Sequence, residues 1–226
     1  MIFRCMATFV RHIVALVAVA LLSVVGGRAW AQEYPNPFMT TGSDVGLVST
    51  EWGAGVGGVY TGFGSISSDA VELNSRLAFE GHLNMAVVIG RYFAVESGMI
   101  YQKGGIDAEY RGKHYDISTS TFEMPLLLSL RLWDGAVRVN GGVQLGLISN
   151  GGYLEGKENY MFGTVTPTWN IATGIGVRVM PNVVVELGYT HALQDGVNQL
   201  GATNKGAGLD FTTRTHKVML GVSLLM

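Results

Sequence analysis

From about residue 76 to its end, the sequence alternates two kinds of connection between runs of alternating hydrophobicity. Some connections are turns of two or three residues, and the others are long polar segments. A connection of two residues can join only antiparallel neighbours, because parallel strands need a crossover of a dozen residues or more. The pattern therefore predicts a series of hairpins whose short turns all lie at one end of the strands.

The clearest strand covers residues 122–133. Its even-numbered positions are apolar, whereas Glu123, Ser129 and Arg131 share the other face, which is the period of two that a strand requires. Asp134-Gly135 follows, a dipeptide that suits a two-residue type I′ turn. The pattern resumes over residues 137–147, so we expect a tight hairpin.

Two further hairpins have the same form. One pairs residues 76–89 with 93–102 around the turn 90–92, and the other pairs 169–179 with 183–190 around Pro181-Asn182. Single strands at residues 51–62 and 211–226 bring the number to eight. We expect long polar loops at about 64–75, 103–117, 149–166 and 196–210, all on one rim.

The two faces of these strands differ in a way that indicates the solvent. One face is aliphatic and aromatic, and the other carries the charged residues Arg131, Arg138, Arg178, Glu80, Glu96, Glu123 and Glu186. Charges cannot be satisfied against hydrocarbon, but they can pair inside a closed wall. The sequence therefore predicts an all-β fold, an eight-stranded antiparallel up-and-down transmembrane β-barrel with its apolar face toward lipid.

Aromatic residues are expected to form two girdles at the membrane interfaces. Those near the short turns are Tyr92, Phe93 and Trp133, and those toward the long loops are Tyr60, Tyr101, Phe122, Trp169 and Tyr189.

The N-terminus has the layout of a secretory signal peptide. Arg4 and Arg11 precede an apolar run over residues 13–25, and Ala29-Trp30-Ala31 offers small residues for cleavage before Gln32. We therefore expect residues 1–31 to be a signal peptide, 32–50 a periplasmic lead and 51–226 the barrel, located in the outer membrane.

Composition excludes several functions. The single cysteine, Cys5, falls in the signal segment, so the mature chain would have neither disulfides nor thiolate metal ligands. Without the signal segment, 12 basic residues face 17 acidic ones, which argues against a nucleic-acid partner. No spacing typical of metal ligands or of a phosphate-binding loop occurs, and we expect no cofactor and no metal.

Three stretches resemble a known family, the outer-membrane β-barrel domain often labelled porin family or PorT-like. They are Glu96-Ser97-Gly98-Met99-Ile100-Tyr101-Gln102-Lys103-Gly104, Phe122-Glu123-Met124-Pro125-Leu126-Leu127-Leu128 and Val139-Asn140-Gly141-Gly142-Val143-Gln144-Leu145-Gly146. The resemblance covers about residues 50–226. It implies a barrel in the outer membrane, in contact with its lipid, and it implies little about activity.

The last six residues resemble the signal that the barrel assembly machinery reads. Gly221, Leu224 and Met226 occupy its glycine and apolar positions, although such signals usually end in an aromatic residue. The assembly machinery is thus an expected partner during biogenesis.

Charged residues placed symmetrically about the turns predict pairs inside the barrel. Arg178 and Glu186 flank Pro181-Asn182, so we expect a buried ion pair between them. Arg131 and Arg138 flank Asp134-Gly135 and would repel each other unless carboxylates such as Glu96, Glu80 or Glu123 compensate them. Such a network would plug the lumen.

Three functions remain open for a barrel of this kind. A structural or surface-recognition role is favoured, with an extracellular ligand bound through the long loops, which carry Tyr110, Tyr115, Tyr153, Tyr160 and Phe162. A narrow porin-like channel is the alternative. A lipid-modifying enzyme at the outer rim is a third. The residues that could supply its catalytic groups are His114, His191, His216, Ser118, Asp116 and Asp195. Because nothing in the spacing assembles a catalytic group, we expect no enzymatic activity.

Overall fold

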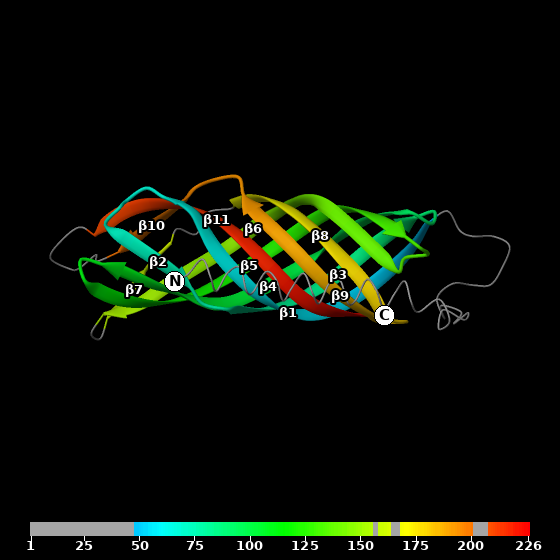
Figure 1. The fold of residues 1–226 in the computed structure, drawn as a ribbon, viewed down its shortest axis with the longest axis horizontal. Helices are drawn as coiled ribbons and strands as arrows, with labels where there is room; N and C mark the ends of the chain where they lie inside the picture. The colour runs from blue at the N-terminus through cyan, green and yellow to red at the C-terminus, as the bar shows by residue number, and fades with distance from the viewer. Residues whose placement is uncertain (1–47, 156–157, 164–167, 201–207) are drawn as a thin grey trace, which may run out of the picture.

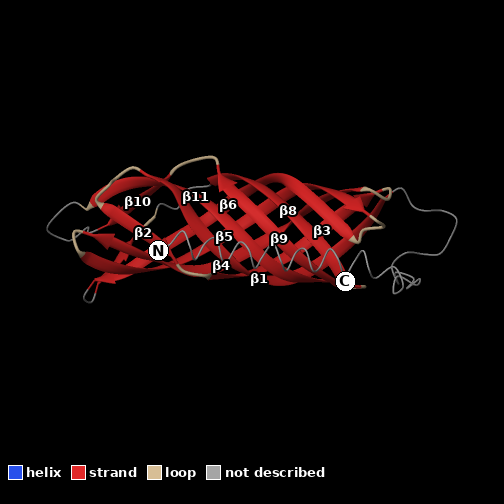
Figure 2. Cartoon of the chain, in the orientation of Figure 1, coloured by secondary structure: helices blue, strands red, loops and turns tan. Residues whose placement is uncertain are grey.

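The computed structural model describes residues 48–155, 158–163, 168–200 and 208–226, and all its regular elements there are strands (Figure 2). The expected signal peptide, its cleavage site and the lead up to residue 47 lie outside the described residues. The first strand begins at Val48, so residues 48–50 belong to the barrel wall rather than to a periplasmic lead.

Eight long strands close into a ring, as predicted. Neighbours around the ring are antiparallel, and the last strand pairs with the first. In ring order the strands are β1 (Val48–Ile66), β3 (Ala78–Ile89), β4 (Phe93–Tyr110), β5 (Lys113–Leu132), β6 (Val137–Glu155), β8 (Thr168–Met180), β9 (Val183–Ala192) and β11 (Leu209–Leu225).

The short turns lie together at one end of the barrel, beside the start of β1 and the end of β11 (Figure 1). Residues 90–92 and Pro181-Asn182 form turns as expected. The turn at Asp134-Gly135 differs, because pairing stops at Leu132 and Val137 and leaves four residues between the strands. Trp133, Asp134 and Gly135 have φ values of 50°, 56° and 79°, so three successive left-handed residues reverse the chain where two were predicted.

Most of the predicted long loops are strands instead, and this expectation was wrong. β4 and β5 stay paired to Tyr110 and Lys113, and Arg111-Gly112 joins them with φ values of 54° and 72°, as a type I′ turn requires. Three short strands continue the wall at this end: β2 (Val71–Ser75) pairs with β4, β7 (Glu158–Met161) with β6, and β10 (Gly196–Leu200) with β11 (Figure 1).

The hydrophobic alternation changes sense along β5, which explains the error. Near the short turns, Leu126 and Leu128 face outward and Arg131 faces the lumen. Toward the other end, Ile117 is fully buried inside while Ser118 is exposed outside. Apolar side chains turn inward in this part of the wall, as they do in soluble barrels whose outer face meets water. The outward residues of such a stretch are polar and its inward residues carry few charges. Its sequence therefore resembles that of a polar loop.

The inward apolar residues of this outer extension form a small core. Its buried members are Val71, Leu73, Ala108, Tyr115, Ile117, Tyr153, Phe162, Leu200 and Phe211. The Tyr115 and Tyr153 rings meet edge to face at 5.1 Å, and those of Phe162 and Phe211 at 6.0 Å. Three aromatic residues that were expected to serve recognition in loops, Tyr115, Tyr153 and Phe162, are thus core residues.

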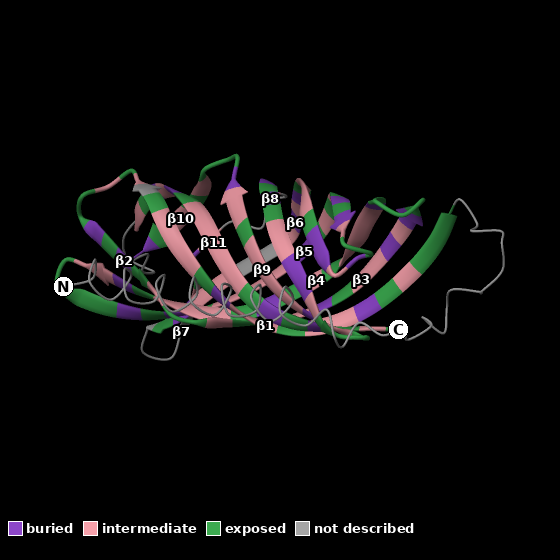
Figure 3. Ribbon diagram, turned by 45° about the vertical axis from the view of Figure 1, so that its right-hand side comes forward, coloured by how far each residue is buried: buried purple, intermediate pink, exposed green. Residues whose placement is uncertain are grey.

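The part of the wall nearer the short turns presents an apolar belt. Phe79 is 73% exposed and Leu128 70% exposed on the outer surface, and exposed and buried residues alternate along the strands (Figure 3). Tyr92, Phe93 and Trp133 are exposed near the short turns, and Tyr60, Tyr101, Trp169 and Tyr189 at the upper border; Phe122 is half-buried. Within the described ranges, no helix could cross a membrane.

Candidate functional site in the barrel lumen

The layer nearest the short turns contains an acidic bridge between two arginines. Glu51 of β1 accepts hydrogen bonds from Arg131 Nη1 at 2.6 Å and from Arg138 Nη2 at 3.1 Å. Arg131 and Arg138 lie opposite each other on β5 and β6, as predicted. β1 and β6 are separated by four steps of the eight-strand ring, so the bridge crosses the full width of the lumen.

The carboxylate that compensates these arginines was missed in the sequence. Glu51 is the first residue of the alternating pattern in the first strand. No short turn joins this strand to β5 or β6, so symmetry about a turn could not predict the contact. Of the carboxylates that were expected to do so, Glu96 lies 3.8 Å from Arg131 Nη2, whereas Glu80 and Glu123 have partners in other layers. Ring closure, which brings β1 across from β6, decides this contact.

The predicted ion pair between Arg178 and Glu186 does not form among the described residues. A register shift between Arg178 and Met180 places Arg178 opposite Val184, while Glu186 faces Gly176. Glu186 instead accepts a hydrogen bond from Ser223 Oγ at 2.9 Å. A bulge near a turn changes which residues face each other, so symmetry about Pro181-Asn182 was misleading.

A histidine layer lies above the arginines. The ring of His82 on β3 places Nδ1 3.1 Å from Glu80 Oε1 and Nε2 2.8 Å from Ser223 Oγ, and Nε2 is 3.6 Å from Glu186 Oε2. The ring fits because Gly55 of β1 lies beside it, where a Cβ would come within 2.2 Å of Nε2. Glycine at position 55 thus makes room for a buried histidine.

The next polar layer toward the outer extension is organised by Lys217 of β11. Its Nζ donates to Glu123 Oε1 at 2.6 Å and to Gln102 Oε1 at 2.8 Å. Gln144 Nε2 also donates to Glu123, and Gln102 Nε2 donates to Glu80 Oε2 at 2.8 Å. β11 and β5 are four steps apart in the ring, so this ion pair too spans the lumen. Lys217 was not among the residues that the sequence predicted in the lumen, although the alternation along the strand puts it, and not its neighbour His216, on the inward face.

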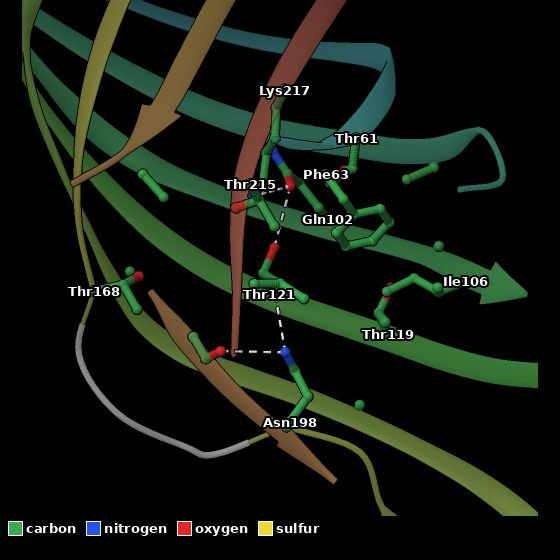
Figure 4. A pocket seen from close by; sticks show the side chains of 18 of the residues that line it. Thr61, Phe63, Gln102, Ile106, Thr119, Thr121, Thr168, Asn198, Thr215 and Lys217 are labelled. Atoms are coloured by element: carbon green, nitrogen blue, oxygen red, sulfur yellow. Dashed lines mark hydrogen bonds between the residues drawn. The ribbon is translucent and has the colours of Figure 1, made fainter. Parts of the chain in front are cut away.

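Two cavities lie on either side of the Lys217 layer. The upper one, of about 170 Å³, is lined by hydroxyl groups of Thr61, Thr119, Thr121, Thr168 and Thr215, and Phe63 lies beside them (Figure 4). The lower one, of about 110 Å³, has Glu80, His82, Glu96 and Glu186 in its wall. Gln102 and Lys217 line both cavities, so these two side chains separate them.

The residues considered for an outer-rim enzyme are spread over the wall. His191 and His216 are cross-strand partners on β9 and β11. Asp195 pairs with Arg214 at 2.8 Å, and His114 lies 3.7 Å from Glu109. Ser118 is exposed on the outer face of β5. In the described parts of the chain, no group of three His, Cys, Asp or Glu side chains could hold a metal ion.

An exposed ion pair lies on the outer extension. Arg76 Nε is 3.0 Å from both oxygens of Asp107, and Arg76 Nη2 is 2.7 Å from Asp116 Oδ1. The hydrogen bond from Arg76 lowers the pKa of Asp107, and the two carboxylates raise the pKa of Arg76.

The residues of the expected assembly signal lie in the strand that closes the ring. Gly221 and Leu224 are opposite Gly57 and Ala54 of β1, and Met226 N donates to Trp52 O at 2.8 Å. Recognition by the assembly machinery stays a prediction.

A closed antiparallel ring with an apolar outer belt, aromatic borders and a charged lumen defines a transmembrane β-barrel of the outer-membrane type. Residues 30–197 match the model of the outer membrane protein β-barrel domain, and the chain belongs to that family. The predicted resemblance and the location in the cell outer membrane are thereby confirmed.

The solved structures to which this chain is similar have little sequence in common with it. OprG from Pseudomonas aeruginosa is 12% identical with a TM-score of 0.50, and the match covers 78% of this chain and 95% of OprG. Neisserial surface protein A is 15% identical (TM-score 0.49; 78% and 97% covered), and Ail of Yersinia pestis 12% (TM-score 0.47; 78% and 98% covered). No curated protein matches in sequence. At these identities the likeness concerns the fold alone.

Proposed function

We propose that this outer-membrane protein is a non-conducting barrel with a structural or surface-recognition role at its outer end. The observation that supports the proposal most strongly is the set of contacts across the lumen. Glu51 with Arg138, and Glu123 with Lys217, join strands on opposite sides of the ring at two heights. The apolar core of the extension lies in the lumen above them, beside the upper cavity.

Energy favours keeping these contacts closed. Breaking a buried ion pair by moving one partner strands the other charge, at a cost of about 3–5 kcal/mol. An ion or solute would have to separate the pairs and then pass an apolar core, which repels hydrated charge.

Single-channel recording in planar bilayers tests this part of the proposal. The purified barrel should add no stable current steps under salt and voltage conditions at which a water-filled porin conducts readily. Reproducible steps from the native chain would refute it.

A recognition role would use the exposed residues of the extension rather than its aromatic core. The β4–β5 hairpin ends in Arg111-Gly112, with Lys113 and His114 exposed beside the turn. Arg111 lies over the ring of Tyr110 at 5.0 Å and Lys113 over that of Tyr115 at 5.2 Å, which attaches the basic residues to a rigid hairpin.

A pull-down from extracellular material should compare the native barrel with a variant that carries Arg111→Ser and His114→Ser. Both substitutions leave the core and the turn glycine intact. A partner held by the native barrel and lost from the variant would support recognition at this tip, and equal capture would place it elsewhere.

A narrow channel is the second candidate, and the two cavities favour it. They share Gln102 and Lys217 in their walls, so a path between them would pass through the Lys217 layer. Single-channel recording in planar bilayers distinguishes a narrow channel from the closed barrel.

A further inference from the structure

The upper cavity receives threonine side chains from several sides of the ring. They are Thr61 of β1, Thr119 and Thr121 of β5, Thr168 of β8 and Thr215 of β11 (Figure 4). Threonine is a common strand residue, but strand preference alone does not gather threonines around one space. Four of the eight ring strands thus bring hydroxyl groups to a cavity of about 170 Å³.

Most of these polar groups have no partner within the described chain. Thr121 donates to Gln102 Oε1 at 3.2 Å, and Asn198 donates to Thr213 Oγ1 at 2.9 Å. No side-chain hydrogen bond between described residues is formed by Thr61, Thr119, Thr168, Thr215 or Asn170, although Asn170 is only 6% exposed. The wall therefore offers donors and acceptors to whatever occupies the cavity.

Aromatic rings in the same wall favour an occupant other than water. Phe63 and Phe162 both line the cavity, and both belong to or pack against the core of the extension. Water molecules can satisfy hydroxyl groups, but they gain nothing from an aromatic ring. A molecule that carries hydroxyl groups and also C–H groups matches both parts of the wall, because ring faces are partly negative and attract C–H edges.

The charged residues of the wall are already paired. Lys217 Nζ lies 2.6 Å from Glu123 Oε1, and Arg76 Nη2 lies 2.7 Å from Asp116 Oδ1. An ionic ligand would have to compete with these pairs, whereas a neutral one would not. The cavity therefore suits an uncharged ligand.

The cavity is accessible from the outer extension. Two of its wall residues reach the surface there: the side chain of Arg76 is 43% exposed, and Val197 is 46% exposed. Toward the membrane the cavity is bounded by Gln102 and Lys217, which are joined by a hydrogen bond of 2.8 Å. Ligand sites are common in the mouths of β-barrels.

We propose that the upper cavity binds a small neutral polyol, of about the size of one pentose ring, that enters from the outer side. A cavity of about 150 Å³ is known to hold one six-membered ring, so the volume is adequate. Threonine is restricted at χ1, so its hydroxyl groups are held in place before the ligand arrives, which lowers the entropic cost of binding. The site needs no partner at the hairpin tip and does not depend on whether the lumen conducts.

D-xylose is the probe for the test. Saturation-transfer NMR is measured on the full chain, folded in a detergent without sugar headgroups, so that the detergent does not compete. Magnetisation should pass from the barrel to the C–H protons of xylose. A neutral ligand of this size should give a dissociation constant on the order of 1 mM in a titration.

The matched variants exchange threonine for valine on the same strand. Thr119→Val combined with Thr215→Val removes two hydroxyl groups of the cavity and keeps the β-branched shape, and the dissociation constant should rise by about 10- to 30-fold. Thr212→Val, at a position of β11 that does not line the cavity, should leave it unchanged. Heat-modifiable migration on a detergent gel verifies that each variant is folded.

A third variant tests occupancy while every hydroxyl group stays in place. Gly196 lines the cavity from β10, and the nearest listed neighbour of an added Cβ is Thr213 O at 3.7 Å. Gly196→Val should therefore be tolerated, and its side chain should weaken xylose binding by taking part of the space.

Two results would overturn the proposal. Absence of saturation transfer to xylose in the native barrel, at concentrations well above the expected dissociation constant, would mean that water alone fills the cavity. Unchanged affinity in the double threonine variant and in Gly196→Val would mean that xylose binds elsewhere.

Discussion

At the scale of single residues, the lumen is governed by charges whose partners lie on distant strands. Glu51 is the central case, because it serves Arg131 and Arg138 at once and its side chain is 20% exposed. The sequence identified both arginines and their opposition across a turn. It did not identify Glu51, because the contact depends on closing the ring.

Replacement of Glu51 by glutamine should therefore destabilise the barrel strongly. Two opposed guanidinium groups would lose their common counter-charge, and the loss should be about 3–5 kcal/mol. Urea unfolding of the barrel in lipid vesicles, followed by tryptophan fluorescence, measures it. Glu72→Gln, on the exposed face of β2, is the control and should change stability by less than about 0.5 kcal/mol; an equal effect of both would contradict the bridge.

Double-mutant cycles distinguish the pair that forms from the pair that does not. Lys217→Met with Glu123→Gln should show a coupling of about 1–3 kcal/mol, because the two groups are in contact at 2.6 Å. Arg178→Ala with Glu186→Ala should show coupling near zero, since the register separates them. A larger coupling energy for Arg178 and Glu186 than for Lys217 and Glu123 would contradict this register of β8 and β9.

The ion pair on the extension gives a pH dependence with a definite sign. Asp107 has a pKa below its ordinary value, owing to the hydrogen bond from Arg76. A depressed carboxyl pKa contributes stability above the unfolded value near 4, and this contribution is lost as the pH falls through the lowered pKa.

Carbon-13 NMR titration of the Asp107 carboxyl group measures this shift. In Arg76→Gln the group should titrate close to the ordinary value, whereas in Asp195→Asn, which alters the other exposed pair, it should stay lowered. A native Asp107 that titrates like a free carboxyl would show that the pair is absent in solution.

At the scale of elements, β5 shows why long strands were predicted as short strands with loops. Its twenty residues rise far more than the ~25 Å of an apolar membrane band, at about 3.3 Å per residue. The lower half has leucines outside, and the upper half has Ile117 and Tyr115 inside. One strand thus obeys two opposite patterns, one for lipid and one for water.

The core of the extension should be a separate unit of stability. Ile117→Ala, at a fully buried position, should cost about 2–4 kcal/mol within this unit. Hydrogen exchange should then accelerate for backbone amides of residues 106–120 and stay unchanged below Glu123. Ser118→Ala, on the outer face of the same strand, is the control, and uniform acceleration over the whole barrel would argue against a separate unit.

At the scale of the whole molecule, the barrel has one border between lipid and water on its outer surface. Cysteines introduced one at a time can locate this border, because the sequence has no cysteine of its own after Cys5. With a membrane-impermeant maleimide on intact cells, Ser118→Cys should be labelled and Leu128→Cys should not. Labelling of position 128, or protection of position 118, would contradict this position of the border.

The sequence by itself determined the barrel, its eight strands, its lipid-facing side and the outer membrane. These follow from local chemistry, since alternation and turns are written in neighbouring residues and the surrounding solvent selects the face. Tertiary structure decided what crosses the lumen: the Glu51 bridge and the Lys217 layer. Those contacts join residues some 80 to 115 positions apart, and only ring closure brings them together.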